Sequence, residues 1–293
     1  AGQAGLSIAA RLGQLDVDTL VVDRWPRVGD NWRKRYHALT LHNQVHTNHL
    51  PYMNYPPNWP TYLPKDKLAG WFESYAECME LNVWTGTELV SGRYDEKAGR
   101  WTAVLRREDG RERTLHPRHI VMATGLSGIP SRPKIPTLEN FRGTVLHSTE
   151  FAEGHGWAGK RALILGTGTS AHDIAQDLQA GGADVTMVQR SPTMVVNVEP
   201  AQIYDRTYLG EGPPIEVRAI INSGVPLPVM KVAHKLVTSE VKALDAPLHA
   251  RLERAGFRLE FGEDGTGWPL KFRTRGGGYY FNVGCSELIA GGK

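Results

Sequence analysis

Two glycine-rich turns contain the residues whose types and spacing could bind a nucleotide. The first is Ala1-Gly2-Gln3-Ala4-Gly5, and the second is Gly166-Thr167-Gly168-Thr169-Ser170-Ala171. Small residues let backbone N–H groups approach a pyrophosphate, and the N-terminus of the following helix favours its negative charge. One such turn is weak evidence, but two turns that each open a helix predict two bound dinucleotides, a flavin and a nicotinamide. We expect Gly2 and Gly5 to bind one of them, and Gly166, Gly168, Thr169 and Ser170 to bind the other.

The residues that follow the second strand of each unit indicate which nucleotide it takes. Asp23 falls about 20 residues after the first turn, where an acid can bind a ribose hydroxyl. The second unit has Gln189-Arg190-Ser191 instead. Arg190 can pair with a 2′-phosphate and Ser191 can add a hydroxyl, which favours NADP over NAD. The alternative is that Asp23 and Arg190 are only polar residues at the surface ends of strands.

The order of elements predicted around these turns is that of an α/β protein. Apolar periodicity predicts helices at 6–15, 65–81 and 170–180, and β-branched runs predict strands at 19–23, 119–125, 161–166 and 184–189. Residues 93–116 read as an antiparallel meander, and residues 201–261 as a mostly helical insertion. Residues 272–284 read as a loop that leads into a strand.

Composition excludes several classes of protein. The 293 residues carry 34 basic and 31 acidic side chains, a net charge of +3 that does not indicate a nucleic-acid partner. No apolar run is long enough to span a membrane, and no signal peptide opens the sequence, so we expect a cytoplasmic protein. Cys78 and Cys285 read as reduced core cysteines. The first turn lacks its preceding strand, so we expect this sequence to be an internal piece of a longer protein.

A more specific pattern lies between the two turns. Phe141, Gly143, His147 and Phe151 form the spacing F-x-G-x-x-x-H-x-x-x-F. With the two glycine turns, Gly29-Asp-Asn-Trp32-Arg33 and Ala123-Thr124-Gly125, it resembles the class B flavin-dependent monooxygenases, specifically the flavin-containing monooxygenase branch. The stretches 50–60 and 276–284 resemble a microbial or fungal subgroup of longer proteins in that branch. The Gly29-Asp30 pair departs from the commoner Gly-Gly of that family.

The resemblance implies a fold, two cofactors and a reaction. It implies two Rossmann-like dinucleotide-binding domains, with an NADP domain (153–293) inserted in an FAD domain (1–152). NADPH would reduce FAD, O2 would add to it as a C4a-hydroperoxide, and one oxygen atom would pass to an amine or a sulfide. Further residues implied to hold the cofactors are Trp32, Arg33, Ala123, Thr124 and Gly125 for FAD, and Arg190 and Ser191 for NADPH.

The resemblance also implies an asparagine near the flavin ring. Asn43 is the candidate for this catalytic role, but the alignment is ambiguous by one residue, so His42 is the other. His147 would have a structural role between the domains. The His42, His46 and His49 spacing could suggest a metal, but Pro51 follows closely and no Cys, Asp or Glu joins the cluster, so we expect no metal site.

Three other functions are weighed against the monooxygenase. A flavoprotein disulfide reductase would need a close cysteine pair, which the sequence lacks, while other reductases stay open. Baeyer–Villiger relatives usually carry tryptophan at the position of Phe151. A fragment that binds nucleotide without turnover is the non-enzyme alternative. The expected partners are a small-molecule substrate and O2. The sequence does not identify the substrate or the oligomeric state, and a homo-oligomer is one option.

Overall fold

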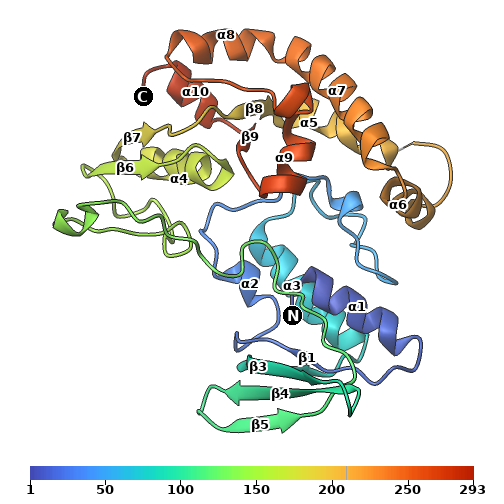
Figure 1. Ribbon diagram of the computed structural model, residues 1–293. Coiled ribbons are helices and arrows are strands. Elements are labelled where there is room, and N and C mark those ends of the chain that lie inside the picture. Colours follow the sequence, from blue (N-terminus) through green and yellow to red (C-terminus); the bar gives the residue numbers. More distant parts are fainter. Residues whose placement is uncertain (209) are drawn as a thin grey trace. The chain divides into compact units, whose positions relative to one another are not determined.

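The computed structural model describes residues 1–208 and 210–293, which divide into two compact units (Figure 1). Unit 1 comprises Ala1–Arg35 and Asn48–Thr149, and unit 2 comprises Tyr36–Thr47 and Glu150–Lys293. The division near Thr149 lies close to the expected boundary at residue 152. In addition, the short segment Tyr36–Thr47 belongs to unit 2. That unit 1 binds FAD and unit 2 binds NADPH stays a prediction.

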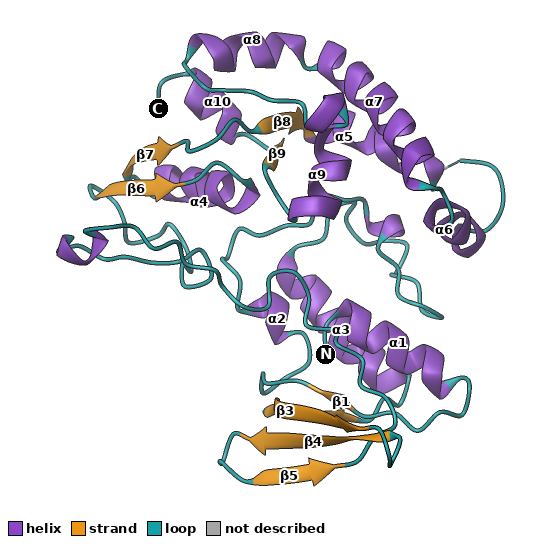
Figure 2. Cartoon of the chain, viewed as in Figure 1, coloured by secondary structure: helices purple, strands orange, loops and turns teal. Residues whose placement is uncertain are grey.

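Unit 1 combines three α-helices with a small parallel pair and an antiparallel meander (Figure 2). Helix α1 buries Leu6, Ala9 and Ala10, a spacing that places them on one helix face. Strands β1 and β2 pair in parallel, and β3, β4 and β5 form the expected meander in sequence order. The bounds in unit 1 are α1 (Gln3–Gly13), β1 (Val21–Val22), α2 (Asp30–Arg33), α3 (Lys65–Cys78), β2 (Val83–Trp84), β3 (Thr87–Asp95), β4 (Arg100–Arg107), β5 (Glu112–Leu115) and the 3-10 helix Leu138–Asn140.

Two expectations for unit 1 were wrong. Residues 119–125 form no strand, and Val121 and Met122 are exposed rather than buried. An apolar run becomes a buried strand only where other strands pair with its edges, and no strand of unit 1 pairs with this run in the described residues. Cys78 is exposed at the end of α3, whereas Cys285 is buried as expected. Both cysteines are free.

Unit 2 contains the second strand–turn–helix–strand unit in full. Strand β6 (Arg161–Leu165) leads through the glycine turn into α4 (Thr169–Ala180), and β7 (Asp184–Val188) pairs in parallel with β6. The register runs from Arg161 opposite Asp184 to Leu165 opposite Val188. Helix α4 buries Ile174, Ala175 and Leu178. This arrangement confirms the elements expected from the sequence to within about a residue.

A second parallel pair and a set of helices complete unit 2. The other bounds in unit 2 are the 3-10 helix Val45–Thr47, β8 (Met194–Asn197), α5 (Val198–Ala201), the 3-10 helix Gln202–Thr207, α6 (Ile215–Ser223), α7 (Leu227–Leu244), α8 (Ala246–Arg254), the 3-10 helix Glu263–Gly265, α9 (Gly267–Arg275), β9 (Tyr279–Asn282) and α10 (Cys285–Ala290). Strand β8 pairs in parallel with β9. The loop expected from residue 272 begins only after Arg275, because α9 continues to that residue. Among the described helices, none is long and apolar enough to cross a membrane.

Helix α8 and the segment after it contribute to the core of unit 2. Leu248 and Leu252 of α8 and the following Phe257 are buried against Val195 and Tyr280 of the two paired strands. The end of the helical stretch 201–261 is therefore part of the same hydrophobic core as the second nucleotide unit. Packing in this core holds the residues around Phe257 in fixed positions.

Candidate nucleotide-binding sites

The first glycine turn is packed against two distant segments of unit 1. Gly2 is the N-cap of α1, and a Cβ added to it would lie 3.2 Å from the side-chain nitrogen of Asn31. A Cβ added to Gly5 would lie 3.5 Å from the Cβ of Ala123. The structure therefore brings the turn, helix α2 and the stretch from Ala123 together, although the sequence separates them widely. Thr124 and Gly125 follow as exposed residues, Gly125 with a φ of +71°.

Asp23 lies at this turn, as its predicted role requires. One carboxylate oxygen of Asp23 accepts a hydrogen bond from the backbone nitrogen of Trp25 at 2.9 Å. The other lies against the backbone nitrogen of Ala1, the first residue of the turn. An acid held beside the turn is suitably placed to accept a hydrogen bond from a ribose hydroxyl. That role stays a prediction.

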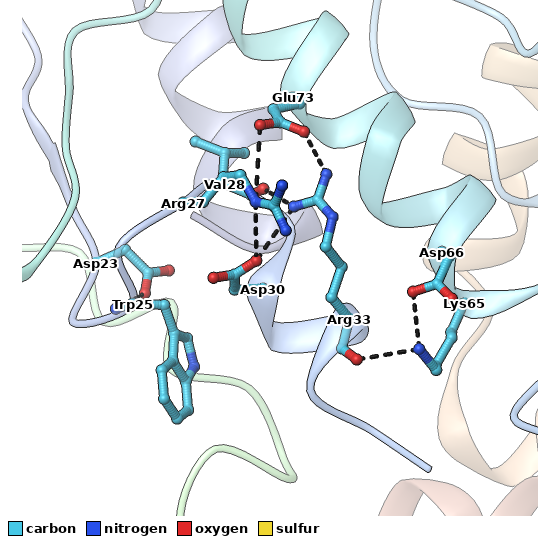
Figure 3. A network of polar contacts seen from close by, with 9 residues as sticks. All are labelled: Asp23, Trp25, Arg27, Val28, Asp30, Arg33, Lys65, Asp66 and Glu73. Carbon is cyan, nitrogen blue, oxygen red and sulfur yellow. Dashed lines mark hydrogen bonds and ion pairs between the residues drawn. The ribbon is translucent and has the colours of Figure 1, made fainter. Parts of the chain in front are cut away.

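Helix α2 is held against α3 by a charged network (Figure 3). Nη1 of Arg33 donates to the carbonyl oxygen of Val28 at 2.6 Å and to Oδ1 of Asp30 at 3.2 Å, while Nη2 pairs with the carboxylate of Glu73. Nζ of Lys65 donates to the carbonyl oxygen of Arg33 at 3.0 Å. The Arg33 guanidinium thus positions α2 within the protein. A direct contact with FAD, expected from the resemblance, stays a prediction.

The Gly29-Asp30 pair starts this helix, and each residue has a physical reason. Gly29 has a φ of +86°, and a Cβ there would lie 2.4 Å from the carbonyl oxygen of Ala69 in α3. Only glycine meets both conditions. Asp30, which stands where the resemblance implies a second glycine, is buried and accepts hydrogen bonds from Arg27 and Arg33, each at 3.2 Å. The departure from Gly-Gly is therefore compensated by two arginines.

Two buried polar atoms of α2 have no hydrogen-bond partner among the described residues. They are Oδ1 of Asn31 and Nε1 of Trp32. Buried polar groups normally have partners, and the Asn31 side chain lies against the glycine turn, so this region fits a polar ligand such as FAD. Sequence analysis identified Trp32 as a site residue but not Asn31. The only sequence signal for Asn31 is that it precedes Trp32 in the motif Gly29-Asp-Asn-Trp32-Arg33.

The second glycine turn, in unit 2, is open. Gly166 has a φ of +121°, Gly168 is the N-cap of α4, and a Cβ added to either would have no neighbour within 4 Å among the described residues. The first turn of α4 contains no acidic residue, and no side chain of the described residues caps its N-terminus. The first N–H groups of a helix have no partner within the helix, so an uncrowded turn at this position fits a pyrophosphate. Ser170 lies half-buried in this first turn, and Thr169 donates its hydroxyl to the carbonyl oxygen of Tyr279 at 3.2 Å.

The end of β7 lies beside this turn. The backbone nitrogen of Gly166 donates to the carbonyl oxygen of Val188 at 2.9 Å, which joins the turn to the last residue of the strand. Arg190 and Ser191 follow and are exposed. A cationic side chain and a hydroxyl at this position fit the 2′-phosphate of NADPH. Their role in binding stays a prediction.

The segment with His42 and Asn43 packs within unit 2. Nε2 of Gln202 donates to the carbonyl oxygen of His42 at 3.1 Å, and the His42 ring meets Phe281 edge-on at 5.7 Å between centroids. Burial lowers the pKa of His42 to about 4, so it is neutral at pH 7. Asn43 is exposed. Its place beside a flavin ring stays a prediction.

A buried acid connects the same segment to α4. The hydroxyl of Tyr36 donates to Oδ2 of Asp173 at 2.7 Å, and both side chains are buried. Burial raises the pKa of Asp173 to about 6, although the hydrogen bond from Tyr36 acts in the opposite direction. The backbone nitrogen of His37 also donates to the carbonyl oxygen of Ala152 at 2.7 Å. These bonds fix the Tyr36–Thr47 segment on unit 2.

The linking motif is locally ordered. Nδ1 of His147 lies 2.9 Å from the hydroxyl of Thr149 and accepts its backbone N–H at 3.2 Å. Phe151 is buried, whereas Phe141 is exposed. His147 thus stabilises a turn at the end of unit 1, in keeping with a structural role. In the described residues, no group of three metal-ligating side chains comes together.

These features define a class of α/β proteins with two glycine turns that each open a helix. Residues 35–209 match the model of the flavin-binding monooxygenase-like family. This chain therefore belongs to that family, which confirms the resemblance and the α/β fold expected from the sequence. It is 32% identical over 211 residues to indole-3-pyruvate monooxygenase YUCCA1 of Oryza sativa, covering 72% of this chain and 50% of the relative. The chain thus spans about half the length of the curated relatives that it matches.

Solved structures support the same fold. A mutant flavin monooxygenase from Stenotrophomonas maltophilia superimposes with a TM-score of 0.60 at 25% identity, covering 67% of this chain and 57% of that protein. OTEMO, solved in complex with FAD and NADP, superimposes with a TM-score of 0.58 at 22% identity, covering 67% of this chain and 39% of that one.

Proposed function

We propose that this protein is an NADPH- and FAD-dependent monooxygenase that transfers one oxygen atom from O2 to a small organic substrate. The main observation is the contrast between the two turns. Unit 1 has an acid at its turn and two unpartnered buried polar atoms in the neighbouring helix α2, which suits FAD. Unit 2 has an open turn that leads to a cationic strand end, which suits NADPH. The family match and the OTEMO complex with both nucleotides support this assignment.

The residues of this chain would bind and orient both nucleotides. In unit 1, the N–H groups after Gly2 would face the FAD pyrophosphate, Asp23 would accept a ribose hydroxyl, and Nε1 of Trp32 would donate to a polar group of the cofactor. In unit 2, α4 would face the NADPH pyrophosphate and Arg190 would pair with the 2′-phosphate. When bound, FAD supplies the redox chemistry and the activation of O2.

The expected oxygen acceptor is a soft nucleophile, an amine or a sulfide. Asn43 would lie near the flavin, with His42 as the alternative. A reductase that acts through paired thiols is disfavoured, because the sequence has no close cysteine pair and burial raises the pKa of the Cys285 thiol to about 12. A cytoplasmic location and a homo-oligomer stay predictions.

A second substrate class has its own support. The relative at 32% identity is named for indole-3-pyruvate, so an aromatic 2-oxo acid is the alternative to an amine or a sulfide.

The test measures product and hydrogen peroxide together. FAD-loaded protein receives NADPH, O2 and one amine, sulfide or aromatic 2-oxo acid at a time. A monooxygenase forms oxygenated product at the expense of peroxide, and the accepted substrate distinguishes the two classes. Peroxide equal to the NADPH consumed with every substrate would contradict the proposal and indicate a reductase or an oxidase.

A further inference from the structure

We infer that Arg258 is a second cationic residue that recognises the 2′-phosphate of NADPH, and this inference rests on the proposed use of that nucleotide. Arg258 lies 68 residues after Arg190 in the sequence. Nη2 of Arg258 donates to the carbonyl oxygen of Gln189 at 2.8 Å and to that of Arg190 at 3.1 Å. The second guanidinium is thus anchored on the backbone of the residues proposed to bind the phosphate.

The backbone at Arg258 is fixed by Gln189. Nε2 of Gln189 donates to the carbonyl oxygen of Arg258 at 2.9 Å, and its Oε1 accepts the backbone N–H of Arg258 at 2.8 Å. One side-chain amide therefore binds both backbone groups of a single residue. This explains why a glutamine precedes Arg190 at the end of β7. It acts as a positioning residue for Arg258.

The same position is also tied to the glycine turn. The backbone nitrogen of Thr193 donates to the carbonyl oxygen of Arg258 at 3.1 Å. The buried hydroxyl of Thr193 lies 2.6 Å from that of Thr167, which is within the Gly166–Gly168 turn. A continuous set of hydrogen bonds thus relates Arg258 to the site proposed for the pyrophosphate.

Packing turns the Arg258 side chain outward. Phe257 is buried in the core of unit 2, and Leu259 packs against the same core. In an extended segment, the residue between two inward side chains points the other way. Arg258 is accordingly exposed, as Arg190 is. Both bonds to carbonyl oxygens come from Nη2 of Arg258, so the guanidinium keeps three N–H donors on its other two nitrogens. Arg190 and Arg258, joined by one of these bonds at the end of β7, together fit a dianionic phosphate.

The experiment compares two probes that differ only in the 2′-phosphate. Calorimetry measures the binding of 2′,5′-ADP and of 5′-AMP to the wild-type protein and to Arg258→Met, Arg190→Met and Arg254→Met. Arg254 is the matched control, because it is an exposed arginine of α8 whose Nε bonds to a carbonyl of its own helix. We expect Arg258→Met to weaken 2′,5′-ADP about tenfold and to leave 5′-AMP unchanged. Arg254→Met should change neither.

The outcomes separate this inference from the proposed function. If the wild-type protein binds 2′,5′-ADP no more tightly than 5′-AMP, the proposed use of NADPH fails. If Arg190→Met weakens 2′,5′-ADP but Arg258→Met does not, the use of NADPH stands and the role of Arg258 is overturned. Equal weakening of both probes by Arg258→Met would also overturn it, because it would show a structural effect. Arg258→Lys, which keeps a positive charge, should retain part of the preference for 2′,5′-ADP.

Discussion

The two glycine turns follow the same sequence rule but occupy different surroundings. The turn of unit 1 is packed, with Gly2 against Asn31 and Gly5 against Ala123. The turn of unit 2 is open, since a Cβ at Gly166 or Gly168 would have no neighbour within 4 Å in the described part of the chain. The turns also differ at the following strand, where unit 1 has Asp23 and unit 2 has Arg190. The glycine pattern thus predicts a place for a pyrophosphate, and we propose that the different surroundings favour a different nucleotide at each turn.

The largest expected effect concerns the stability of unit 1, where α2 packs against α3 beside the first glycine turn. Gly29→Ala should lower the free energy of unfolding by about 4 kcal/mol, because it adds left-handed strain to a collision with Ala69. Gly99→Ala is the control, since its φ is +61° and its added Cβ would contact none of the described atoms. Gly99→Ala should lower the free energy of unfolding by only about 1 kcal/mol. Urea unfolding measures both, and equal losses would show that the Gly29–Ala69 contact does not hold α2.

The second prediction concerns the pH dependence of unit 2. The pKa of Asp173 is raised from 3.8 to about 6 on folding, mainly by burial. A raised carboxyl pKa stabilises the fold below the unfolded pKa, and this contribution is lost as the pH rises through about 6. Asp173→Asn should therefore become more stable relative to the wild type as the pH rises from 4 to 7.5, by about 2.5 kcal/mol.

Thermal or urea unfolding at matched pH values measures this difference. The neighbouring His172, whose pKa burial lowers to about 4, acts in the opposite direction, but it is present in both proteins and largely cancels. Tyr36→Phe removes the hydrogen bond that favours the charged carboxylate and so raises the folded-state pKa of Asp173 further, which should make the loss of stability larger and extend it to a higher pH. A constant difference between Asp173→Asn and wild type across this range would refute the burial effect.

The third prediction uses the contrasting strand ends. Asp23→Asn should weaken the binding of FAD by about 2 kcal/mol, because it removes a charged acceptor for a ribose hydroxyl, and it should leave the binding of NADPH unchanged. Arg190→Met should weaken the binding of NADPH and leave that of FAD unchanged. Flavin retention and NADPH titration measure the two affinities on the same preparation. If either variant weakens both nucleotides equally, the two units do not have separate ligands.

The smallest effect concerns the unpartnered indole nitrogen of Trp32 in α2. Trp32→Phe removes a buried donor and should weaken FAD about fivefold, close to 1 kcal/mol. Trp71→Phe is the matched control, since its Nε1 is also buried without a partner among the described residues. Neither change should destabilise the protein without FAD by more than about 1 kcal/mol through lost packing. Weaker FAD binding in both variants, measured by fluorescence titration, would show that Trp32 has no specific role.

The sequence predicts best the elements that local patterns determine. Strands β6 and β7 and helix α4 match expectation because the glycine turn, the apolar strands and the short connections all act within about 30 residues. The run at residues 119–125 has an equally apolar pattern, yet it is exposed and forms no strand. Its state depends on strand partners, which a local pattern does not reveal.

The site shows the same limit. The roles of Asn31 and Arg258 depend on contacts with residues far away in sequence, Gly2 for one and Gln189 for the other. Arg33 was identified by its motif, but its contacts with Val28, Asp30 and Glu73 show that its guanidinium acts inside the protein. Motifs therefore located the turns and the neighbouring charges, whereas the structure was needed to assign partners to them.

The most direct test of the central claim is an anaerobic titration of FAD-loaded protein with NADPH, followed by the visible absorbance of the flavin. Two sites with separate nucleotides predict that the flavin is bleached while it stays bound, and that Arg190→Met requires more NADPH for the same bleaching. Unchanged absorbance at saturating NADPH, or release of FAD by NADPH, would contradict the account.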